Sequence, residues 1–93
     1  MQQDILDKIK KDFKNIEEVV GILESKESSY PGPISDRINR GIIFLAQGDM
    51  VKLDHFIELS IKDYRDLIWQ AEYEDPEVQK YDFNKSFYEL GLL

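Results

Sequence analysis

The one histidine of the chain limits the catalytic chemistry that its sequence can support. Any Ser-His-Asp arrangement within one chain would use His55, and the lack of cysteine excludes a thiol nucleophile and thiolate metal ligands. His55 and Glu58 are three residues apart, the spacing with which bundle helices present metal ligands, but the carboxylates of the first helical segment lie on its polar face. We therefore expect no catalytic residue, metal or cofactor. A bundle-interior ligand site or enzyme site around His55, Glu58 and Arg65 is the alternative hypothesis.

A second polar group consists of three arginines and two aspartates, namely Arg37, Arg40, Arg65, Asp63 and Asp66. Guanidinium groups bind carboxylates in a fixed bidentate geometry, which suits an ion pair between neighbouring helices. We predict that Arg37 or Arg40 pairs with Asp63 or Asp66 and locks the second and third helices together. An anion-binding or catalytic role for these residues is the alternative, because structural ion pairs and functional sites look alike in a sequence.

Aromatic residues gather in the last third of the chain. Trp69 and Tyr73 adjoin an acidic stretch, and residues of these types are enriched where proteins bind one another. The alternative for Trp69 and Tyr73 is a place in the hydrophobic core. Phe83 and Phe87 follow the acidic stretch, and we expect them to fold back over the helices.

The charge and the glycine pattern exclude other classes of function. The net charge is −7, and residues 71–93 carry six acidic and two basic side chains, so the surface repels a phosphate backbone. The five glycines form neither a GxG motif nor a GxxxxGK[ST] motif, so no phosphate-cradling loop is indicated. We expect no nucleic-acid partner. Mimicry of nucleic acid by residues 72–82 is a third hypothesis.

Apolar periodicity predicts an all-α fold, a small helical bundle in one domain of 93 residues. Leu6, Ile9 and Phe13 begin a stripe with helical spacing, and the Tyr-Pro-Gly-Pro sequence after Ser29 interrupts it. The expected elements are a helix over about 3–26, a Pro/Gly loop over 28–35, a helix over about 36–47, a helix over about 50–73, an acidic crossing over 74–82 and a short helix over about 84–90.

The unequal lengths of the expected helices bear on assembly. At 1.5 Å per residue, the helices over 3–26 and 50–73 would each span roughly 35 Å, and the helix over 36–47 only about 18 Å. The short helix cannot cover both long apolar stripes. We expect Phe83, Phe87 and Leu90 to cover part of them and a second copy of the chain to cover the rest, as a homodimer.

These observations favour a non-enzymatic protein-interaction module. The partner would be a protein or a second copy of the chain, with no nucleic acid and no membrane. The longest apolar run, Ile42 to Ala46, is far shorter than the roughly 20 residues that a membrane helix needs. Together with the lack of cysteine, this leads us to expect a cytoplasmic location.

Overall fold

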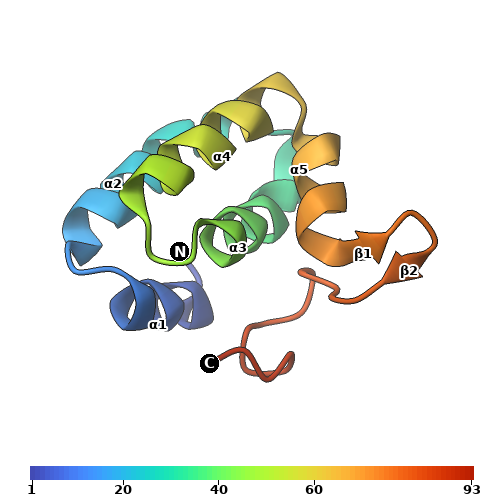
Figure 1. The fold of residues 1–93 in the computed structure, drawn as a ribbon. Helices are drawn as coiled ribbons and strands as arrows, with labels where there is room; N and C mark the ends of the chain where they lie inside the picture. The colour runs from blue at the N-terminus through green and yellow to red at the C-terminus, as the bar shows by residue number, and fades with distance from the viewer.

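Helices make up most of the fold in the computed structural model, which describes residues 1–93, with Gly32 described by its backbone alone (Figure 1). Over these residues the chain forms five α-helices, two short 3-10 helices and one two-stranded sheet. The all-α prediction is therefore confirmed in outline, although the sheet was not expected. The elements are α1 (Gln3–Asp12), α2 (Ile16–Lys26), η1 (Glu27–Ser29), η2 (Gly32–Ile34), α3 (Ser35–Ala46), α4 (Met50–Lys62), α5 (Tyr64–Glu72), β1 (Tyr73–Asp75) and β2 (Val78–Gln79).

α3 is the central helix, and it confirms the helix expected over about 36–47. It packs against α1, α4 and α5, and in Figure 1 it lies between α1 and α4. Ile38, Ile42 and Ile43 are fully buried along it. No helix in the described part of the chain has both the length and the apolar character that a membrane crossing requires.

The prediction of one helix over 3–26 is wrong, because the chain bends between α1 and α2. Phe13 adopts an extended backbone (φ −119°, ψ 150°) and is buried. The Asn15 side chain then accepts a hydrogen bond from the Glu18 backbone N–H at 3.3 Å and donates to the Glu18 carboxylate at 3.0 Å. This cap satisfies a donor that a helix start leaves free, so a second helix begins here.

The prediction of one helix over about 50–73 is also wrong, because α4 ends and α5 begins on either side of Asp63. Asp63 has an extended backbone (φ −155°, ψ 92°), and its N–H closes α4 on the Leu59 carbonyl at 2.7 Å. Its carboxylate accepts hydrogen bonds from the backbone N–H groups of Arg65 and Asp66, at 3.1 and 3.4 Å. One aspartate thus ends α4 and begins α5.

The Pro/Gly loop expected over 28–35 contains η1 and η2 and is held to the core by Tyr30. The Tyr30 hydroxyl lies 2.5 Å from Ser60 Oγ. Ser60 donates its only proton to the Ile57 carbonyl at 2.6 Å, so Tyr30 is the donor to Ser60. Burial raises the pKa of Tyr30 despite the bond to Ser60, and this favours the neutral, donating form.

The C-terminal third folds back over the helices, as expected, but without the helix predicted over about 84–90. The acidic crossing at 74–82 contains the β1–β2 hairpin, in which Tyr73 pairs with Gln79 and Asp75 with Val78. Turns follow in place of a helix, because buried side chains bind the backbone of this segment. Phe83 and Phe87 are fully buried, and Leu90 packs against the core.

Candidate functional site

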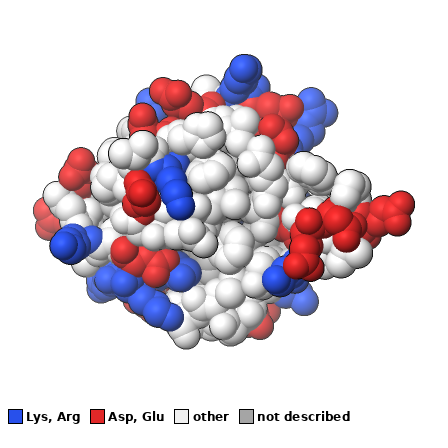
Figure 2. All heavy atoms as spheres, in the orientation of Figure 1, with Lys and Arg blue, Asp and Glu red and all other residues white. Residues whose placement is uncertain are grey.

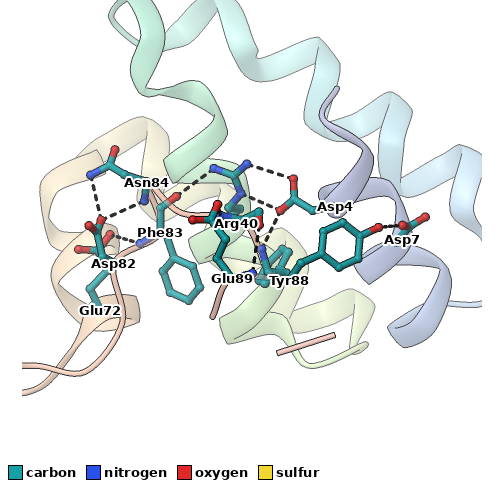
Figure 3. A network of polar contacts seen from close by, with 11 residues as sticks. Asp4, Asp7, Arg40, Glu72, Asp82, Phe83, Asn84, Tyr88 and Glu89 are labelled. Carbon is teal, nitrogen blue, oxygen red and sulfur yellow. Dashed lines mark hydrogen bonds and ion pairs between the residues drawn. The ribbon is translucent and has the colours of Figure 1, made fainter. Parts of the chain in front are cut away.

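A buried ion pair joins the two ends of the chain to α3. Arg40 donates to the Asp4 carboxylate from Nε at 2.9 Å and from Nη2 at 3.1 Å. Its Nη1 donates to the Phe83 carbonyl at 3.1 Å, and Asp4 also accepts the Phe87 N–H at 2.9 Å. Figure 3 shows the guanidinium between the Asp4 carboxylate and the Phe83 carbonyl. Each member of the pair therefore also holds the backbone of the C-terminal segment.

The environment of Asp4 keeps its carboxylate ionised. Burial opposes ionisation and would by itself raise the pKa of Asp4. The hydrogen bonds from Arg40 and Phe87 and the positive charge of Arg40 together outweigh that effect, so the pKa lies below its ordinary value of 3.8. Asp4 is therefore a charged group with a structural partner, not a proton donor at neutral pH.

A second buried carboxylate, Glu72, organises the other half of the same segment. Arg37 donates to it twice, at 2.7 and 2.6 Å, and the Glu72 side chain is fully buried. Glu72 also accepts the Phe83 N–H at 3.1 Å and the Gln79 side-chain amide at 2.9 Å. The bond to Glu72 is the main reason that the pKa of Arg37 is raised. We call Asp4, Arg37, Arg40 and Glu72 the charged clamp.

The charged clamp corrects the ion pairs predicted from the sequence. Arg37 and Arg40 bind Glu72 and Asp4, so the predicted pairing with Asp63 or Asp66 is wrong. Asp63 is occupied as a helix cap, and Asp66 accepts from Gln70 at 3.4 Å. Arg65 lies 3.8 Å from Asp63 with 82% of its side chain exposed, a geometry that contributes little to stability. A polar hollow of about 350 Å³ adjoins Arg37 and Arg40, and side chains of both charges line it.

His55 and Glu58 lie on the surface and not inside the bundle. With Leu59 and Lys62 they line an open hollow of about 200 Å³ on α4, and both are exposed. Arg65 is on α5 and does not line that hollow. Over the described residues, no group of three or more His, Cys, Asp or Glu side chains is placed to hold a metal ion.

Phe83 and Phe87 belong to the core, so they are not available to a partner. Their rings are 5.9 Å apart in an edge-to-face arrangement, and Phe44 lies 5.3 Å from Phe83 in a cluster that also contains Tyr81. Aromatic packing of this kind adds to the stability that burial provides. The prediction that these residues fold back over the helices is confirmed. The sequence analysis did not identify Glu72 and Asp4, the carboxylates that bind the backbone N–H groups of Phe83 and Phe87.

Trp69 is an exposed residue near the end of α5, and the β1–β2 hairpin follows that helix directly. Its side chain is 46% exposed, and Tyr73, one turn later, is half-buried. Beyond it the hairpin exposes Val78 (49%) and three carboxylates, those of Glu74, Asp75 and Glu77. Figure 2 shows these acidic side chains gathered over the hairpin, at the right of the view. We call Trp69, Glu74, Asp75, Glu77 and Val78 the acidic edge.

The acidic edge combines exposed apolar groups with carboxylates that have few cations near them. Within the described residues its one ion pair joins Lys80 and Glu74 at 3.7 Å, with both side chains more than half exposed. An exposed tryptophan and an exposed valine in a part of the chain with this charge can bind an apolar group that carries positive charge. No family model, curated protein or solved structure matches the chain, so these contacts are the basis for inferring its function.

Proposed function

We propose that the chain is a non-enzymatic protein-binding module that binds a basic segment of a partner protein at the acidic edge. The observation that carries this proposal is the exposure of Trp69 near the end of α5 and of Val78, Glu74, Asp75 and Glu77 on the hairpin that follows that helix. Exposed tryptophan is costly to leave in water and is enriched among residues that contribute most to binding. The proposal includes the cytoplasmic location expected from the lack of cysteine.

Charge supports a basic partner over other classes. Residues 71–93 carry six acidic and two basic side chains, and the whole chain has a charge of −7. One of the six, Glu72, is buried in its pair with Arg37, which leaves five carboxylates of this segment outside the charged clamp. This field accelerates association with a positively charged protein and repels phosphate groups. A second copy of the chain would bring the same carboxylates to the contact.

Photo-crosslinking tests the proposal. A photoreactive amino acid at Val78, which is half exposed, should capture a protein whose crosslinked segment is rich in Lys or Arg. With that purified partner, Trp69→Ala and the triple variant Glu74→Lys, Asp75→Lys, Glu77→Lys should each weaken binding by about tenfold or more. The affinity of the unaltered chain should fall as salt is raised.

A matched triple variant controls for net charge. Glu17, Glu24 and Glu58 are exposed carboxylates on α2 and α4, away from the acidic edge, and their change to Lys alters the charge by the same amount. We expect the affinity of this control to stay close to that of the unaltered chain. Equal weakening by both triples would show a general charge effect, and unchanged binding by both would show that the partner binds elsewhere.

The alternative, a ligand or metal site around His55, Glu58 and Arg65, has less support. Its three side chains are not brought together, because Arg65 lies on α5 beside Asp63. A thermal shift on adding divalent ions that disappears in His55→Ala would revive it.

A further inference from the structure

A groove separate from the acidic edge runs between α2 and α4. It has a volume of about 220 Å³ and is lined by four apolar side chains and two carboxylates (Figure 1 shows the two helices). Its lining consists of Glu18, Ile22, Met50, Leu53, Asp54 and Ile57. Neither the charged clamp nor the C-terminal segment contributes to it.

The floor of the groove is apolar and stays apolar along α4. Leu53 and Ile57 are almost fully buried and form the floor, while Ile22 is half-buried and Met50 is 39% exposed. Ile61, 48% exposed, lies one turn beyond Ile57 on the same stripe of α4. The groove is therefore an apolar strip that water still reaches.

Two carboxylates flank this strip, Glu18 from α2 and Asp54 from α4. Both are exposed, and neither forms an ion pair with any described side chain. Glu18 accepts a hydrogen bond from the neutral Asn15 side chain at 3.0 Å and has no cationic side chain as a partner. Like charges on both sides of an apolar groove repel one another and favour a cation placed between or beside them.

We propose that this groove binds an amphipathic helix of a second protein, which inserts one large apolar side chain and places Lys or Arg next to Glu18 and Asp54. The volume fits a side chain and is smaller than the about 300 Å³ at which sites for drug-sized ligands begin. The helix-in-groove mode suits an apolar strip between two helices. A second copy fits poorly, because a two-fold contact would bring the same carboxylates to it.

Peptide titration followed by NMR tests this site in the full chain. The probe is an amidated helical peptide of about 14 leucine and lysine residues, with Leu at i, i+3, i+4 and i+7, at about 0.15 M salt. We expect the largest amide shift changes at Ile22, Leu53 and Ile57. The double variant Glu18→Lys, Asp54→Lys should weaken binding by about tenfold, and a leucine–glutamate peptide should not bind.

The matched control is Glu24→Lys with Glu58→Lys, which changes the same charge on the same two helices outside the groove. It should keep the affinity within about twofold. Thermal unfolding of both variants checks that each is fully folded at the temperature of the titration, because Glu18 lies in the first turn of α2. Shift changes confined to the acidic edge, equal losses in both variants, or no binding of the leucine–lysine peptide would each overturn the proposal. Shift changes at the acidic edge in addition to those in the groove are expected if the proposed function is right, and the groove variant should leave them unchanged. Self-association that the groove variant abolishes would also overturn it, in favour of a second copy.

Discussion

Asp4 is a single carboxylate that joins α1, α3 and the C-terminal segment. It accepts from Arg40, 36 positions later, and from Phe87, 83 positions later. The sequence indicated that Arg37 and Arg40 were structural, because arginines in an acidic protein often form fixed bidentate pairs with carboxylates, but it could not indicate their partners. Those partners are set by the path of the backbone, and both Asp63 and Asp66 were equally plausible until the break before α5 was known.

Replacement of Asp4 tests the charged clamp at the level of one residue. Asp4→Asn leaves Arg40 buried without a counter-charge, so we expect a loss of about 3 kcal/mol in the free energy of unfolding at pH 7. Denaturant titration at several pH values measures it. Because the folded pKa of Asp4 is lowered, its contribution is complete above the unfolded value of 3.8 and is lost as the pH falls through the folded value.

The difference between Asp4→Asn and the unaltered chain should therefore stay constant well above pH 3.8 and shrink below it. Asp7→Asn on the same helix is the control, since Asp7 meets only the exposed Tyr88 hydroxyl and the Gln3 side chain. A difference that does not change with pH would show that Asp4 acts through packing and not through its charge.

At the scale of elements, side-chain caps determine where the helices end and begin, which the apolar periodicity does not show. The stripes over 3–26 and 50–73 keep helical spacing across both breaks, so periodicity alone predicts two long helices. Asn15 with Glu18 three residues later has the spacing of a capping box, and Asp63 precedes the polar start of α5. Those signals were readable. The β1–β2 hairpin could not be predicted in this way. Its base is held by backbone hydrogen bonds, from the N–H groups of Lys80 and Tyr81 to the Glu72 carbonyl, and backbone bonds leave no pattern of side chains in the sequence.

The corner between α3 and α4 gives a prediction about an element boundary. Gly48 has a φ of +80°, and a Cβ there would collide with the backbone carbonyl of Asp12. Asp49 then caps α4 by accepting from the backbone N–H groups of Val51 and Lys52, at 2.8 and 3.2 Å. We expect Gly48→Ala to destabilise the fold by more than about 1 kcal/mol, from the left-handed backbone and the collision together.

Gly21→Ala is the matched control for this corner. Gly21 lies in α2, and no atom outside its own helical turn comes within 4 Å of the position that an added Cβ would take. Alanine there should therefore stabilise the helix by up to about 1 kcal/mol. Thermal unfolding measures both variants, and at this chain length each kcal/mol corresponds to roughly 4–8 °C. If the thermal midpoint moved in the same direction in both variants, Gly48 would not be required by the conformation of the corner between α3 and α4.

At the scale of the whole molecule, the breaks in the two long helices remove the reason for expecting a homodimer. The long apolar stripes that were expected to extend past a short α3 do not form, because each of the two long helices is broken into two shorter ones. Of the four resulting helices, α1, α4 and α5 pack against α3. Phe83 and Phe87 then cover the core from the same chain. The radius of gyration, 12.1 Å, agrees with the about 12 Å expected for a compact chain of 93 residues. The homodimer expected from the sequence thus loses the argument on which it depended, and its test is the mass of the chain in solution.

We expect light scattering across a tenfold dilution to give the monomer mass of 11.0 kDa throughout. Of the exposed apolar side chains, Trp69 and Val78 belong to the acidic edge and Met50 lines the α2–α4 groove. Both surfaces carry carboxylates, so a contact between two copies through either surface would bring like charges together. High salt screens that repulsion, and a mass that doubles only at high salt would show that charge alone prevents pairing. A stable mass of twice 11.0 kDa at low salt would instead require an interface that avoids both surfaces. The triple variant of the acidic edge and the double variant of the groove would then leave the dimer intact.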